Sequence, residues 1–222
     1  RHLGKTGFTH ILHLPHCASE QTIKYYAGEI SEFVTAVEGL SGKKIADSDL
    51  ARAIEVCNRR RSLMLEVYEM RKQDVPPLSG AEMVGLTTAG TLMPVDRFNQ
   101  ELADLLPYIR ERQAQLSSPA TRIMVSSDFA DNPAYVEVIE DAGCVVAMDD
   151  FDTGSRYYWG LVELDGRDPQ RAIAHRYLGQ PGPARMVAWE AQIEQTAEWV
   201  KEFNIHGVIE LAQRYSRSRE MR

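Results

Sequence analysis

The second half of the chain alternates short apolar runs with amphipathic stretches, and this alternation restricts the fold more than any other feature. Three short runs are rich in valine, isoleucine or methionine: Arg122–Ser127, Gly143–Met148 and Gly207–Leu211. Buried apolar strands that alternate with helices are typical of a parallel, doubly wound sheet. We therefore predict an α/β domain of the flavodoxin-like kind over residues 119–222. Its helices are expected around 133–142, 154–164, 169–178 and 184–203.

The first 118 residues are predicted to be mostly helical, attached to the end of an upstream α/β domain. Thr9–Leu14 is expected to form a short strand, and Ser19 is a good N-cap for the helix that follows it. Apolar residues then recur at helical spacing in successive stretches. These stretches are 20–38, 47–75, a shorter helical or irregular one at 79–92, and 94–115. Ser117–Pro119 has the composition of a linker between the two parts.

Charge and cysteine content limit the classes of function. The net charge is −7, and the last ten residues are basic, so the remainder of the chain is acidic and a nucleic-acid partner is not expected. No apolar run is long enough to span a bilayer, so no membrane association is expected. The three cysteines, Cys17, Cys57 and Cys144, form no CxxC or Cys/His cluster. Isolated, apolar-flanked thiols suggest a reducing compartment, and we expect a cytoplasmic protein.

Polar residues follow the predicted strands at the points where ligands bind in doubly wound sheets, beyond the carboxyl ends. They are Ser126–Asp128, Asp149–Asp150 with the loop to Arg156, and the turn after Leu211. Thr153 and Gly154 precede Arg156, whose guanidinium is suited to a carboxylate or a phosphate. In an alternative interpretation, Asp149 or Asp150 caps the next helix and Arg156 pairs with a neighbouring acid. The spacing alone does not choose between the two.

The histidines do not indicate a metal site. His10 and His13 would face opposite sides of a strand, and His16 follows Pro15, so no compact ligand set forms. His175 and His206 are expected to be structural. The chain also lacks the P-loop, GxGxxG and GxSxG motifs, which argues against nucleotide hydrolysis, Rossmann-type redox chemistry and serine hydrolysis.

The order of several segments resembles the benzoyl-CoA reductase / 2-hydroxyacyl-CoA dehydratase family. The segments that carry the resemblance are Leu12–Pro15, Tyr25–Tyr26 with Glu29, Leu50–Ile54 with Asn58 and Arg61, Glu140–Tyr157, Arg176–Leu178 with Pro181, and Gly207–Ile209. The pattern Asp149–Asp150, Thr153–Tyr157 is nearest to the reductase branch. The resemblance covers nearly the whole chain, and the order and spacing of these motifs carry it.

The resemblance implies a subunit of an iron–sulfur acyl-CoA reductase or dehydratase. In this family a homologous second catalytic subunit completes the core, each subunit has a [4Fe-4S] cluster, and an ATP-hydrolysing activator supplies low-potential electrons to a CoA thioester. Thiolate ligation lets proteins tune the potential of such clusters over a wide range. The reductase branch implies reduction of an aromatic acyl-CoA thioester.

This sequence departs from the family pattern at the expected cluster ligands. Two family cysteines would lie upstream of Arg1, and Ser216 stands where a third is expected. We therefore expect no metal ligand in this chain and a [4Fe-4S] cluster only in the full-length complex. The residues expected to bind substrate are Ser127, Asp128, Asp150, Thr153, Gly154, Arg156 and Arg214. The basic tail from Arg214 onward would attract the phosphates of CoA.

Two other functions are compatible with these patterns. One is a non-catalytic, cluster-free α/β module of the same fold that binds or regulates. The other is an unrelated flavodoxin-like domain that binds a flavin or a small metabolite.

Overall fold

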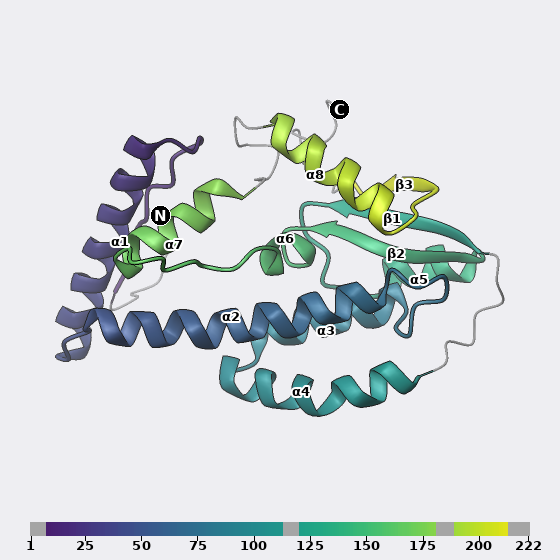
Figure 1. Ribbon diagram of the computed structural model, residues 1–222, viewed down its shortest axis with the longest axis horizontal. Coiled ribbons are helices and arrows are strands. Elements are labelled where there is room, and N and C mark those ends of the chain that lie inside the picture. Colours follow the sequence, from purple (N-terminus) through teal and green to yellow (C-terminus); the bar gives the residue numbers. More distant parts are fainter. Residues whose placement is uncertain (1–7, 113–119, 181–188, 213–222) are drawn as a thin grey trace. The chain divides into compact units, whose positions relative to one another are not determined.

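The structure, a computed structural model, describes residues 8–112, 120–180 and 189–212 (Figure 1). The elements are α1 (Glu20–Ser41), α2 (Asp47–Met70), α3 (Gly80–Leu92), α4 (Val95–Glu111), β1 (Thr121–Ser127), α5 (Ala134–Asp141), β2 (Cys144–Phe151), α6 (Ser155–Tyr158), α7 (Pro169–Gly179), α8 (Trp189–Glu202) and β3 (Gly207–Glu210). The predicted α/β class, with a mostly helical N-terminal part and a parallel sheet, is confirmed. None of the described helices has both the length and the apolarity needed to cross a membrane.

The chain divides into two compact units. Unit 1 consists of the chain up to Glu55 and Val162–Gln180, and unit 2 consists of Val56–Leu161 and the chain after Gln180. The predicted boundary between residues 118 and 119, with the linker around it, lies outside the described residues.

Unit 1 is built on α1 and α7, which pack against each other. Ser19 caps α1 as predicted: its hydroxyl accepts from the Thr22 amide, and the Thr22 hydroxyl accepts from the Ser19 amide. Ile54, Val162 and Ala172 form a small buried apolar cluster in this unit. The apolar spacing seen in the sequence therefore does produce helices with one buried face.

The prediction of a strand at residues 9–14 is wrong. The segment is extended but pairs with no other strand among the described residues, and a strand needs a neighbour for its backbone groups. It lies instead against α1, where the His10 ring contacts the Phe33 ring at 5.3 Å. The amide and ring Nδ1 of His13 both bond Glu29 Oε2, at 2.8 and 2.9 Å, and these bonds lower the pKa of Glu29.

Unit 2 contains a parallel sheet in the order β2-β1-β3, which matches the first three strands of a flavodoxin-like sheet. Alternate residues of β1 face opposite layers. Val125 packs with Val84 of α3 and Val136 of α5, while Met124 packs with Trp199 of α8. Helices therefore cover both faces of the sheet, with α8 on one face and α3 and α5 on the other, as Figure 1 shows.

Two buried arginines, Arg71 and Arg122, hydrogen-bond the segment that follows α2 to the sheet. Arg71, at the end of α2, donates to the carbonyl groups of Val146 and Ala147 on β2 and to those of Leu78 and Ser79. These bonds satisfy backbone carbonyl groups of β2, a strand that has only β1 as a described neighbour. Burial lowers the pKa of the Arg71 guanidinium, and its four carbonyl acceptors compensate for the lost water. The second arginine, Arg122 of β1, donates in the same way to the Arg71 carbonyl.

The helix predicted over residues 154–164 is shorter than expected. It makes one turn, Ser155–Tyr158, and the backbone leaves the helical conformation at Trp159, followed by Gly160 at a φ of 74°. The Trp159 ring contacts the rings of Tyr68 and Trp199 edge-on, at 5.8 and 5.2 Å. Packing of this indole therefore outweighs the local helical pattern.

Candidate functional site

The parallel register brings three polar residues side by side near the carboxyl ends of the strands. Ser126 of β1 pairs with Asp150 of β2 on one side and with Glu210 of β3 on the other. The Ser126 hydroxyl donates to Asp150 Oδ2 at 2.9 Å. The polar strand tips thus meet at one edge of the sheet, where doubly wound proteins bind their ligands.

A cavity of about 740 Å³ lies between these strands and α8, entirely within unit 2. The sheet contributes Met124 and Ser126 from β1, Asp150 from β2, and Val208 and Glu210 from β3. This volume lies within the range of roughly 300–1,000 Å³ that is usual for small-molecule sites.

The opposite wall of the cavity is one face of α8. Ile193, Thr196, Ala197 and Val200 line it, and Lys201 adds a positive charge at its end. Two apolar side chains of the cavity, Ile193 and Val208, are 58% and 53% exposed. The cavity therefore opens to solvent, with an apolar body and a few polar groups, which is the composition expected of a site for an amphipathic ligand.

Asp150 is fixed in this cavity by Arg156. Arg156 Nε donates to Asp150 Oδ1 at 2.5 Å, and a terminal nitrogen donates to Oδ2 at 2.6 Å. The other terminal nitrogen reaches Asp152 at 2.9 Å. Burial opposes the charged guanidinium, but the bonds and charges of the two aspartates raise the pKa of Arg156. Arg156 therefore pairs with neighbouring acids, as in the second of the two sequence interpretations.

Asp149 points away from the cavity into a buried network. Tyr68 donates to Asp149 Oδ2 at 2.7 Å, and the Ser155 amide donates to Oδ1 at 2.8 Å. Burial raises the pKa of this carboxyl, although both hydrogen bonds act in the opposite direction. Asp149 thus connects α2 to the first turn of α6, through Tyr68, which precedes it by 81 residues, and through Ser155.

Gly154 is required by this network. A Cβ at position 154 would lie 1.9 Å from Asp149 Oδ1, so no other residue fits without displacement of the carboxylate. The absent side chain lets the backbone approach an internal carboxylate closely. That Gly154 also lets the backbone approach a ligand closely stays a prediction.

The remaining predicted site residues hold the loops at the strand tips. The Ser127 hydroxyl donates to the Leu211 carbonyl at 2.9 Å, and the Thr153 hydroxyl donates to the Ala130 carbonyl at 3.4 Å. The Asp128 carbonyl accepts from the Asp152 amide at 3.2 Å. None of these three residues lines the cavity, whereas Asp150 does. Arg214 and Ser216 lie outside the described residues.

Several cavity residues were not among those expected to bind substrate, although Ser126 was named among the polar residues at the strand tips. Ser126 and Glu210 share the face of Met124 and Val208, and the two-residue period of a strand carries that information. Thr196 and Val200 follow each other at i, i+4 on α8, so helical spacing would have placed them on one face. The sequence does not reveal which helix covers which face of the sheet.

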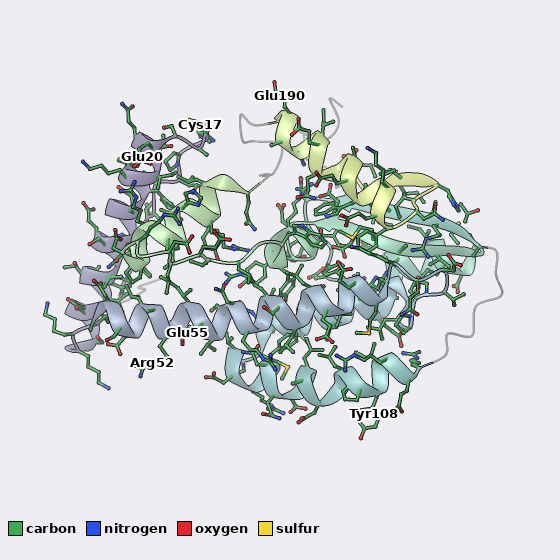
Figure 2. All side chains as sticks on the ribbon, viewed as in Figure 1. Cys17, Glu20, Arg52, Glu55, Tyr108 and Glu190 are labelled. Carbon is green, nitrogen blue, oxygen red and sulfur yellow. The ribbon has the colours of Figure 1, made fainter. Side chains whose placement is uncertain are left out.

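The described residues do not fit an iron–sulfur cluster. Such a cluster needs several thiolates around one point, and no described group of three or more His, Cys, Asp or Glu side chains is arranged to hold a metal. Cys17 lies in the exposed loop before α1 in unit 1 (Figure 2), whereas Cys57 and Cys144 are half-buried in unit 2. The three thiols are thus distributed over different elements.

Residues 1–221 match the family described as 2-hydroxyglutaryl-CoA dehydratase, D-component. The chain belongs to this family. It is 31% identical over 156 residues to a subunit of benzoyl-CoA reductase from Thauera aromatica, covering 69% of this chain and 40% of that protein. It is 23% identical over 208 residues to a protein of Escherichia coli (strain K12) named "Putative dehydratase subunit YjiM", covering 91% of this chain and 54% of that protein.

The family resemblance inferred from the motifs is therefore confirmed. The matched parts make up about half of the length of these two relatives, or less. The region that matches the family includes all three described strands and the cavity against α8.

Proposed function

We propose that this protein is a subunit of an acyl-CoA reductase or dehydratase of the benzoyl-CoA reductase type, and that the cavity between α8 and the sheet holds the thioester arm of its substrate. One observation carries the proposal: a cavity of about 740 Å³ at the strand tips, in a chain of the dehydratase D-component family. The name of the Thauera relative supports the reductase type.

The lining of the cavity suits an acyl-pantetheine arm. That arm is a long, mostly apolar chain interrupted by amide groups, so it needs apolar walls and a few hydrogen-bonding partners. Met124, Val208 and Ile193 give the apolar walls. Ser126 and Glu210 give polar contacts, and Lys201 supplies a cation suited to a phosphate of CoA. Arg214, whose predicted role is also to attract these phosphates, follows β3 by only four residues in sequence.

In this proposal Arg156 is a positioning residue. Its two bonds to Asp150 keep that carboxylate at one orientation on the cavity wall, hydrogen-bonded to Ser126. A carboxylate so restrained accepts a hydrogen bond from a bound amide or hydroxyl without first losing its own freedom. Loss of Arg156 would therefore weaken ligand binding through Asp150.

The proposed complex contains a homologous second catalytic subunit and an ATP-hydrolysing activator. Reduction of an aromatic acyl-CoA requires low-potential electrons, and the family resemblance implies a [4Fe-4S] cluster for their transfer. Because the described residues do not fit a cluster, we assign it to the complex and give this chain the task of holding the thioester.

Calorimetric titration of the full chain with benzoyl-CoA, CoA and benzoate tests the proposal. We expect benzoyl-CoA to bind most tightly, CoA more weakly, and benzoate without detectable heat. Turnover of benzoyl-CoA by the full-length protein with its partner subunit, activator and ATP tests the reductase type. Absence of binding by benzoyl-CoA would refute the thioester site.

The second candidate is a cluster-free binding or regulatory module of the same fold. The lack of a metal-ligand group among the described residues favours it. Such a module would bind the thioester, yet it would leave turnover by the partner subunit and activator unchanged when it is omitted. Activity assays with and without this chain therefore separate the two candidates.

A further inference from the structure

Three consecutive arginines of α2 have very different surroundings. Successive residues of a helix point about 100° apart, so Arg59, Arg60 and Arg61 leave the helix in different directions. Arg59 is exposed, whereas Arg60 and Arg61 are 5% and 3% exposed. Burial of a guanidinium is costly unless acceptors replace the water it loses.

Other buried arginines of unit 2 have several acceptors each. Arg71 donates to four backbone carbonyls, and Arg122 donates to the carbonyls of Phe203, Gln73, Asp74 and Arg71. Burial lowers the pKa of Arg122 as it does that of Arg71, but these acceptors surround the charge. The fold thus supplies a full set of partners where an arginine has a structural role.

Arg60 is less completely paired, and its partners are neutral. It donates to the Gly90 carbonyl at 2.8 Å and to the Tyr157 hydroxyl at 2.6 Å. Its guanidinium also lies 5.1 Å from the centre of the Tyr157 ring, a favourable position for a cation. Its Nε has no partner among the described residues.

Arg61 differs from all of these. Its one acceptor in the described part of the chain is the side-chain oxygen of Asn58, one turn earlier on the same helix, at 3.0 Å. A guanidinium has five N–H donors, and the Nε of Arg61 is buried without a partner among the residues that the structure describes. No described carboxylate forms an ion pair with Arg60 or Arg61. Within the described ranges, two adjacent buried positive charges are therefore left without a negative counterpart.

We propose that Arg61 is a binding residue for a small oxyanion, either a carboxylate or a phosphate. The planar guanidinium presents Nε and a terminal nitrogen as a fork that matches two oxygens of such a group. An oxyanion would satisfy the Nε of Arg61 and compensate for both buried charges. Arg60 adds to the positive potential at the site, while Asn58 holds the other side of the guanidinium. This inference does not rest on the proposed thioester function, because Arg60 and Arg61 do not line the cavity against α8.

The test compares Arg61→Met with Arg59→Met in the full chain, by thermal unfolding in a buffer poor in anions. Methionine keeps much of the arginine volume without its charge, and Arg59 is the exposed neighbour on the same helix. If the Arg61 charge lacks a counterpart in the free protein, Arg61→Met should melt at or above the wild-type temperature. A variant that fails to fold, or melts well below wild type, would mean that Arg61 is structural and would refute the proposal.

Inorganic phosphate and glutarate are then added separately, with sodium chloride at matched ionic strength as a control for screening. We expect one of the two oxyanions, at about 100 times its Kd, to raise the midpoint of wild type and of Arg59→Met by roughly 5–10 °C. The midpoint of Arg61→Met should respond no more than it does to sodium chloride. The effective probe identifies the oxyanion as a phosphate or a carboxylate. If neither oxyanion shifts the wild type more than chloride does, or if Arg61→Met shifts equally, the proposal is wrong.

Discussion

Asp150 and Arg156 form an ion pair with two hydrogen bonds at the tip of β2, and their side chains are only 7% and 8% exposed. The pair restrains Asp150, which among the described residues of the predicted site is the one that lines the cavity. Both charges are removed from water. Loss of either one should therefore cost more folding stability than it would in an exposed ion pair.

Replacement of Arg156 by methionine should therefore lower the free energy of unfolding by about 3–5 kcal/mol, because it leaves the Asp150 carboxylate buried without its counter-charge. Urea unfolding measures this. Arg97→Met is the control, since its pair with Glu101 is 70% and 61% exposed and should contribute about 0–1 kcal/mol. The double variant Asp150→Asn, Arg156→Met should recover part of the loss. A loss below about 1 kcal/mol for Arg156→Met would contradict a buried pair.

Gly154→Ala should destabilise the fold by about 1–3 kcal/mol, because its Cβ would lie 1.9 Å from an oxygen of Asp149 and displace the carboxylate. Gly85→Ala in α3 is the matched control, as nothing lies within 4 Å of the added Cβ. In that helix the change should be stabilising by about 0.5–1 kcal/mol. Equal effects of the two substitutions on urea unfolding would count against the close approach at position 154.

Asp149 should give unfolding a characteristic pH dependence. Its raised pKa means that the folded protein keeps the proton to a higher pH than the unfolded chain does. The stability from this proton is present below the ordinary aspartate pKa and is lost as the pH rises through the raised value. The stability of wild type minus that of Asp149→Asn should therefore fall as the pH rises from acid toward neutral. A flat difference for Asp149→Asn would contradict the pKa raised by burial.

Much of the fold could be predicted because it depends on local patterns. The capping residue Ser19 and the apolar spacing after it define α1, and valine-rich runs define β1 and β2. The parallel direction of the strands could be predicted from the alternation of strands and helices along the chain. The prediction of a strand at residues 9–14 was wrong, because a local sequence pattern cannot show whether a partner strand exists.

The candidate site could be predicted only in part, because its decisive contacts join distant residues. Nothing in the sequence links Tyr68 to Asp149, or shows that α8 closes the cavity over Ser126. The pairing of Arg156 with Asp150 and Asp152 likewise depends on tertiary structure, since an arginine near several acids in sequence is compatible with a paired or a ligand-binding role. Spacing located the strand tips, and tertiary packing decided which of their side chains face the cavity.

The 222-residue chain alone should assemble no four-iron cluster. Anaerobic reconstitution with iron and sulfide, followed by metal and sulfide analysis, should leave it far below four irons per chain, because its three cysteines lie on separate elements. Stoichiometric four-iron loading would contradict this prediction.

The most direct test of the thioester site is to fill the cavity. Ala197 lies on its α8 wall, so Ala197→Trp should place an indole in the space assigned to the acyl-pantetheine arm. Glu194→Trp adds the same bulk to an exposed position of α8 that does not line the cavity. By calorimetry with benzoyl-CoA, Ala197→Trp should weaken binding by at least about tenfold, equal to about 1.4 kcal/mol, while Glu194→Trp binds as wild type does. Unchanged binding by a folded Ala197→Trp variant would contradict the placement of the thioester in this cavity.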